Sequence, residues 1–168
     1  MEIVNLKLTN FRNYEKLEIT FNDHLNLIYG NNGMGKTNLV EAISVLALTR
    51  SFRAVVDKNL ILKSKNVLKI EGNIKSHYTN NYKVIINNDG KKVKIDNTKV
   101  LKISDYISKI NVVIFSPDDL KIIKDTPSIR RKSINIAISQ INISYLQNLN
   151  NYNKILKQRN AYLKTMAV

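Results

Sequence analysis

Cysteine is absent from this 168-residue chain, and its absence excludes several kinds of site. Without cysteine the chain has no disulfide framework, no thiolate metal site and no thiol nucleophile. The chain also lacks long apolar runs, because no stretch approaches the roughly 20 residues that a membrane-spanning helix needs. The first residues do not have the layout of a signal peptide, so the sequence predicts a cytoplasmic protein.

Acidic residues are scarce, and they are unevenly distributed. The chain has 27 lysine and arginine residues against 13 aspartate and glutamate residues, a formal net charge of +14. Residues 1–50 are balanced, whereas no acidic residue follows Asp125. A one-signed stretch of this length favours a nucleic-acid or phosphate surface over a solvated face, although a coding bias towards lysine would also raise the charge. The candidate DNA contacts are Arg130, Arg131, Lys132, Lys157 and Arg159.

One stretch of eight residues carries the clearest chemistry. It fits G-x-x-x-x-G-K-[ST], the phosphate-binding loop (Walker A) of nucleoside triphosphatases. Its residues are Gly30, Asn31, Asn32, Gly33, Met34, Gly35, Lys36 and Thr37. The glycines permit positive φ values, so that backbone N–H groups can turn towards a polyphosphate. Lys36 would reach the β- and γ-phosphates of ATP, and the Thr37 hydroxyl would ligate Mg²⁺.

The residues on both sides of this loop match the motif. A short apolar run at residues 25–29 predicts a strand that leads into the loop. Apolar residues then recur at helical spacing to about Leu48, with no glycine or proline in residues 36–51. A helix there would direct its N-terminal N–H groups at an anion. The alternative is a glycine-rich turn with a solvated lysine, which does not explain the complete motif. The sequence therefore predicts a nucleotide site.

The remaining pattern predicts an α/β fold. Alternating apolar residues predict strands at residues 3–9, 14–21, 67–74, 82–86 and 93–95, with a tight turn at 88–90. Short helices are expected at residues 58–62, capped by Asp57, and at residues 99–108. A continuous apolar run at residues 110–115 predicts a buried central strand.

The four residues after that run, Ser116-Pro117-Asp118-Asp119, resemble the layout of a metal-binding carboxylate at a strand tip. Pro117 would push the chain off the sheet edge, because proline lacks a backbone donor. The two aspartates are therefore expected to be N-terminal acids of a following helix. Asp118 stays a candidate Mg²⁺ ligand.

Residues 127–168 change to an all-helical pattern. Thr126 or Ser128 can cap a first run, and Ser144 can cap a second in which apolar residues recur at near-heptad spacing. Such spacing is equally typical of an amphipathic core helix and of a coiled arm. No glycine or proline ends the second run, so the chain is expected to be cut from a longer protein.

Several of these stretches together resemble the N-terminal part of the RecF family, recombination mediators related to the SMC and Rad50 ATPase heads. The likeness lies in the turn at residues 10–14, the loop at 30–37 and the helix start at 37–43. It continues at residues 115–120, 127–132 and 152–160, and so covers the whole chain. RecF proteins are about twice as long.

The resemblance implies an ABC-ATPase-like head. Residues 1–126 would form its lobe I, a mixed sheet around the phosphate-loop helix with a β meander, and residues 127–168 would begin a helical lobe II or arm. It implies an ATP- and Mg²⁺-dependent homodimer that binds duplex and gapped DNA. It also implies cooperation with RecR and RecO in loading RecA, during DNA recombination, replication and the SOS response to DNA damage.

The same resemblance assigns roles to further residues. Arg12 and Asn13 would lie beside the nucleotide, and a salt bridge is the other explanation for Arg12. Residues 116–118 would occupy the metal-sensing position. The Walker B and signature segments would lie in the missing half. The chain alone is therefore expected to bind nucleotide weakly or not at all and not to turn over, whereas the longer protein would be a weak, DNA-dependent ATPase.

Three other readings compete with this one. Another SMC- or Rad50-like head, including that of a defence nuclease, would continue the last helix into a long coiled coil. A non-hydrolysing DNA-binding scaffold would keep the loop only for its structure, and its DNA affinity would not depend on nucleotide. An ABC transporter subunit fits less well, because the one-signed basic stretch does not suit it.

Overall fold

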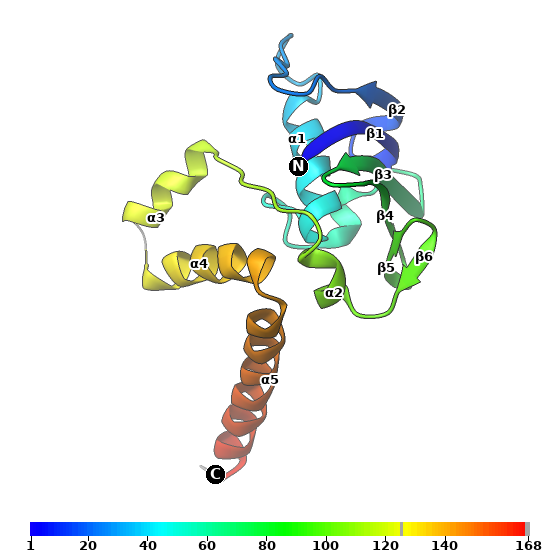
Figure 1. The fold of residues 1–168 in the computed structure, drawn as a ribbon. Helices are drawn as coiled ribbons and strands as arrows, with labels where there is room; N and C mark the ends of the chain where they lie inside the picture. The colour runs from blue at the N-terminus through cyan, green and yellow to red at the C-terminus, as the bar shows by residue number, and fades with distance from the viewer. Residues whose placement is uncertain (125, 167–168) are drawn as a thin grey trace. The chain divides into compact units, whose positions relative to one another are not determined.

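The structure, a computed structural model, describes residues 1–124 and 126–166, with Asp118, Lys121 and Lys124 described by their backbone alone. The chain forms two compact units, residues 1–114 and 115–168. The fold class is α/β, as predicted, with the strands in the first unit and the long basic helices in the second (Figure 1). The division at residues 126 and 127 into lobe I and the start of lobe II stays a prediction.

The first unit is built on a six-stranded sheet in the order β2-β1-β3-β4-β5-β6, and every pairing in it is antiparallel. The strands are β1 (Glu2–Phe11), β2 (Tyr14–Thr20), β3 (Val67–Lys75), β4 (Thr79–Asn87), β5 (Gly90–Ile95) and β6 (Thr98–Val100). Buried and more exposed side chains alternate along β3 and β4. The sheet therefore has one apolar inner face and one polar outer face.

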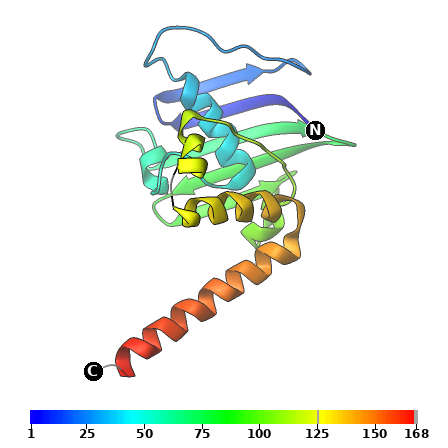
Figure 2. The same cartoon turned by 90° about the vertical axis from the view of Figure 1, so that its left-hand side faces the viewer.

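Helix α1 (Lys36–Leu48) lies across the inner face (Figures 1 and 2). A Cβ atom at Gly72 of β3 would lie 2.7 Å from Leu46 Cδ2, so glycine allows this close approach. The hydroxyl of Tyr106 in α2 (Ile103–Ile107) donates a 2.7 Å hydrogen bond to the Leu46 carbonyl oxygen. The Tyr106 ring packs edge-on against Tyr82, with 5.9 Å between centroids. The phosphate-loop helix is thus held by the sheet and by α2.

Two tight turns connect β4, β5 and β6 along one edge of the sheet. Asn87 pairs with Gly90 across the predicted turn at residues 88–90. The next turn was not predicted: Asp96 and Asn97 both have positive φ, 47° and 66°, as a two-residue hairpin requires. It adds β6, and because residues 98–100 pair with β5, the helix predicted at 99–108 is confined to Ile103–Ile107.

Two predicted strands are wrong. Residues 25–29 and 110–115 are not strands in the structure. Leu25 is 82% exposed and Val113 is 96% exposed. A strand forms only where a neighbouring strand satisfies its backbone groups, and neither run belongs to the six-stranded sheet that the described residues form. Both runs are apolar, but an apolar pattern alone does not specify which strand, if any, would pair with the segment.

Other local predictions also need correction. Asp57 begins the 3₁₀ helix η1 (Asp57–Leu60) but makes no side-chain cap, and its carboxylate instead pairs with Lys91 at 3.0 Å. The second unit contains η2 (Pro117–Leu120), α3 (Lys121–Lys124), α4 (Pro127–Ile141) and α5 (Ile143–Met166). Asn142, not Ser144, caps α5, because its Oδ1 accepts the Tyr145 N–H at 2.9 Å. None of the described helices is long and apolar enough to cross a membrane.

Candidate nucleotide-binding site

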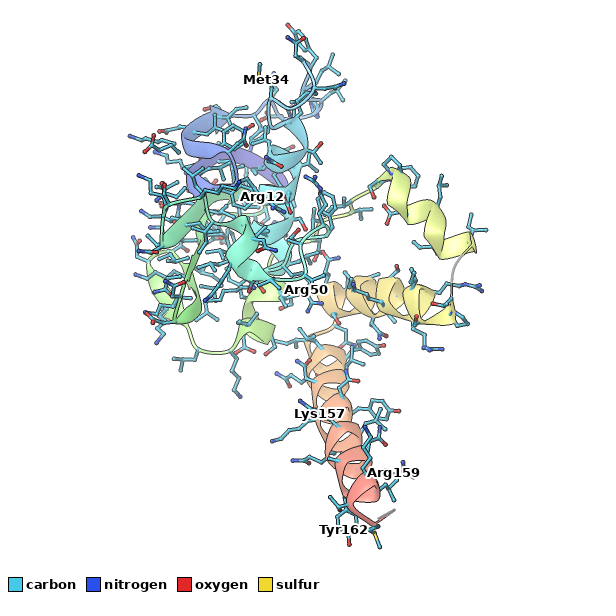
Figure 3. All side chains as sticks on the ribbon, turned by 180° about the vertical axis from the view of Figure 1, so that it is seen from behind. Arg12, Met34, Arg50, Lys157, Arg159 and Tyr162 are labelled. Carbon is cyan, nitrogen blue, oxygen red and sulfur yellow. The ribbon has the colours of Figure 1, made fainter. Side chains whose placement is uncertain are left out.

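The predicted phosphate loop is an irregular segment that leads directly into α1. Its three glycines all have positive φ: 141° at Gly30, 84° at Gly33 and 100° at Gly35. A Cβ atom at Gly30 or Gly33 would meet nothing within 4 Å, so backbone conformation and not crowding favours glycine at these two positions. Figure 3 shows Met34 on the loop ahead of α1. Most of the loop is exposed to solvent.

The lysine of the motif is bound to the loop itself. Lys36 Nζ donates to the carbonyl oxygens of Gly30 at 2.6 Å and Asn31 at 2.7 Å. The first hydrogen bond of α1 runs from Leu39 N–H to the Gly35 carbonyl oxygen at 3.0 Å. The N–H groups in the first turn of α1 therefore have no partner within the helix and can receive an anion. The loop, the Lys36 ammonium and the start of α1 therefore lie together, and their contact with a nucleotide stays a prediction.

The turn between β1 and β2 supports this loop from one side. A Cβ atom at Gly35 would lie 2.7 Å from the Tyr14 hydroxyl and 2.8 Å from Asn13 Nδ2, so this glycine is required by contact as well as by φ. Asn13 also accepts a 2.8 Å hydrogen bond from Asn38 Nδ2, one residue after Thr37. Burial raises the pKa of Tyr14. Asn13 thus lies against the start of α1, next to the predicted phosphate site.

Arg12 forms the salt bridge that the sequence left as its alternative role. Its Nε and Nη2 donate to the two Glu41 carboxylate oxygens at 2.9 and 2.7 Å, and Nη1 donates to the Asn59 carbonyl oxygen at 2.8 Å. Glu41 lies in α1 and is fully buried. Such a bidentate pair fixes two planar groups relative to each other, and it ties the β1–β2 turn to the phosphate-loop helix. A contact between Arg12 and nucleotide stays a prediction.

The segment after α1 is bound to the same carboxylate. Ser51 Oγ donates to Glu41 Oε1 at 2.5 Å and accepts the N–H groups of Arg53 and Ala54 at 2.8 and 2.7 Å. Arg53 Nη1 lies 3.2 Å from Asn38 Oδ1 and 3.8 Å from Glu41 Oε2. Sequence reasoning missed Glu41, Ser51 and Arg53. The available signal was a glutamate among the apolar residues of α1.

The residues present fit a metal ion held mainly by the nucleotide. Thr37 is exposed at the start of α1, where its hydroxyl could supply one Mg²⁺ ligand. No cluster of three or more histidine, aspartate, glutamate or cysteine residues able to hold a metal occurs among the described residues. Mg²⁺ usually keeps several waters and binds substrate phosphate oxygens together with one or two protein carboxylates, so Thr37 could supply one ligand of an ion that the nucleotide brings with it.

The other candidate residues lie in the second unit. Asp119 Oδ2 accepts the N–H and hydroxyl of Ser116 at 2.6 and 2.9 Å, at the start of η2, as expected for a helix-terminal acid. The side chain of Asp118 lies outside what the structure describes. Arg130, Arg131 and Lys132 are exposed on α4.

Lys157 and Arg159 are exposed along α5 (Figure 3). Their exposure allows contact with DNA but does not test it, so all five basic candidates on α4 and α5 stay predictions.

Comparison with protein families agrees with the geometry. The family model for the AAA domain matches residues 5–167. The curated DNA replication and repair protein RecF of Streptococcus thermophilus is 45% identical over 98% of this chain and 45% of its own length. The RecF of Oceanobacillus iheyensis is 46% identical over 99% of this chain and 45% of its own length. The chain thus spans about half the length of these relatives.

Solved structures give the same picture. A structure described as the recombination mediator protein RecF with ATP, in the RecFOR pathway, superimposes with a TM-score of 0.93 at 35% identity, over 98% of this chain and 45% of that one. An SMC head domain from Thermotoga maritima superimposes with a TM-score of 0.52 at 19% identity, over 62% of this chain and 40% of that one. The second likeness concerns the fold alone.

Proposed function

This chain belongs to the AAA domain family and is RecF-like along almost its whole length, and from that premise we propose that it forms the ATP-binding part of a DNA-repair protein. The observation that carries the proposal is the position of Lys36. Its ammonium group is hydrogen-bonded to the carbonyl oxygens of Gly30 and Asn31 at the start of the glycine-rich loop, and α1 begins at Lys36 itself. This is the arrangement that cradles polyphosphate in P-loop proteins.

Several residues of the loop and of the start of α1 then have defined parts in binding. Lys36 exchanges two carbonyl partners for β- and γ-phosphate oxygens, because a charged acceptor makes the stronger hydrogen bond. The N–H groups of the first turn of α1 receive the phosphates, and Thr37 holds the metal. Mg²⁺, when bound, neutralises part of the phosphate charge. Asn13 and Tyr14 lie so close to Gly35 that a Cβ atom would not fit there.

Hydrolysis needs more than this cradle. A catalytic group must also position the attacking water, and transition-state charge must be neutralised. We propose that these groups come from the additional length of the RecF-like protein and from a second copy of it, in an ATP-dependent homodimer. The function of the whole would be DNA repair and replication, with binding to duplex and gapped DNA and cooperation with RecR, RecO and RecA. The net charge of +14 supports the DNA partner.

Calorimetry of ATP with Mg²⁺ tests the site directly. The wild-type chain is expected to bind ATP weakly and the Lys36→Ala variant not to bind it. Lys99→Ala, which removes the same charge from β6, should bind as the wild type does. Measurable ATP binding that is equally tight in wild type and Lys36→Ala would contradict the proposed site. Steady hydrolysis by this chain, abolished by Lys36→Ala, would contradict the need for further catalytic groups. Duplex DNA binding without any ATP binding would favour the scaffold function.

A further inference from the structure

The outer face of the sheet is rich in lysine. The pairing register places Glu18, Lys7, Glu71, Lys83, Lys94 and Lys99 in one row that crosses all six strands. The adjacent row contains Lys16, Thr9, Lys69, Ile85 and Lys92. Neither row could be read from the sequence, because each strand contributes only one residue to it.

All of the glutamates on this face are already paired, whereas most of the lysines are not. Lys7 pairs with Glu18 at 2.7 Å, Lys83 with Glu71 at 3.1 Å and Lys75 with Glu2 at 3.8 Å. Five lysines remain without an ion pair among the described residues. We call this set the sheet face: Lys16, Lys69, Lys92, Lys94 and Lys99.

The placement of these lysines opposes folding. Lys94 lies directly between Lys83 and Lys99 in the register, and like charges opposite each other destabilise a sheet. A bound polyanion would offset that repulsion. The face extends over six strands, about 24 Å at the usual strand spacing. Duplex DNA carries about 14 phosphate charges over that length.

The chemistry of the face favours the phosphate backbone of a duplex. None of the outward strand positions in the two rows is aromatic, and Ile85 is the apolar exception among them. A surface for single strands stacks bases on aromatic side chains, and an amphipathic membrane-binding helix inserts apolar side chains, so this face fits a duplex backbone better than either ligand. Lysine ammonium groups contact phosphates without reading base sequence.

We propose that the sheet face binds the sugar-phosphate backbone of duplex DNA, independently of base sequence. The inference rests on the DNA-binding part of the proposed function and adds the surface and its mode of contact. It differs from the sequence prediction, which assigned DNA contacts to α4 and α5.

Salt-dependent binding to a 30-base-pair duplex, followed by fluorescence anisotropy, tests this surface. The variant Lys69→Gln/Lys92→Gln/Lys94→Gln removes three charges from the sheet face. The competing variant Lys154→Gln/Lys157→Gln/Lys164→Gln removes three charges from α5, where the sequence prediction placed DNA contacts. A second sheet-face variant, Lys69→Gln/Lys92→Gln/Lys99→Gln, leaves the half-buried Lys94 in place and covers the case in which the first variant fails to fold.

The sheet-face variants are expected to lower the slope of log K against log salt by about 2.7, which corresponds to three phosphate contacts, and to weaken binding about tenfold or more at low salt. Because the inference assigns the contacts to the sheet face, the competing α5 variant should keep the wild-type slope. If the sheet-face and α5 variants lost DNA affinity equally, or if only the α5 variant lost it, the inference would be overturned. The proposal that the protein binds DNA would still stand. Equally tight binding of a single strand of the same length would also overturn it. If wild type binds ATP but no duplex, the inference and the DNA partner both fail and the nucleotide site stands.

Discussion

Replacing Arg12 by alanine would leave the Glu41 carboxylate buried without its main partner. The substitution removes hydrogen bonds of 2.9 and 2.7 Å to Glu41 and one of 2.8 Å to the Asn59 carbonyl oxygen. Glu41 is 0% exposed, so in the native packing its carboxylate depends on protein partners and not on water. Breaking a buried ion pair in this way destabilises a protein by about 3–5 kcal/mol.

The lower end of that range applies here. The side chain of Arg12 is 23% exposed, and Glu41 keeps the Ser51 hydroxyl at 2.5 Å and Arg53 at 3.8 Å. A loss of about 3 kcal/mol lowers the melting temperature by about 6–12 °C for a chain of this size. Thermal unfolding followed by circular dichroism measures the shift. The double variant Arg12→Met/Glu41→Leu, which removes both charges, should recover most of the stability, because no buried charge remains.

A surface ion pair provides the matched control. Lys65 pairs with Glu15 at 3.2 Å, but the two side chains are 41% and 75% exposed. Lys65→Ala is therefore expected to cost less than about 1 kcal/mol. If Arg12→Ala melted at the same temperature as Lys65→Ala, the argument that Glu41 depends on Arg12 would be refuted. A double variant less stable than Arg12→Ala would refute the argument that the unpaired charge is the cause.

Three further substitutions test other parts of the structure. Gly35→Ala should abolish ATP binding, because the new Cβ would lie 2.7 Å from the Tyr14 hydroxyl at a φ of 100°; unchanged calorimetric binding would contradict this. Asp96 has its pKa lowered by the Asn81 N–H, so its contribution to stability is present above about pH 4 and is lost as the pH falls. Urea unfolding of Asp96→Asn should show less loss of stability below pH 4 than wild type, and identical pH profiles would contradict it. Tyr106→Phe should lower the free energy of unfolding by about 1 kcal/mol through its lost hydrogen bond, and no change would contradict it.

The features that the sequence predicted correctly depend on residues that are close together in the chain. The phosphate loop is recognisable because residues 30–37 carry both the glycines that positive φ favours and the lysine that reaches phosphate. Helix α1 and strands β1 to β5 followed from apolar periodicity, which records which side of each element is buried. Periodicity failed at residues 25–29 and 110–115, because an apolar run shows that a segment should be buried and does not identify the strand beside it.

The contacts around the site and across the sheet depend on residues far apart in the chain. Arg12 and Glu41 are 29 positions apart, and only the packing of the β1–β2 turn on α1 brings them together. Likewise, Lys69 and Lys92 lie in one row because β3, β4 and β5 pair in one register, and a shift of one residue would send either side chain to the other face. The sequence by itself therefore determined where a phosphate could bind. The tertiary structure decided what supports that loop and which lysines share a surface.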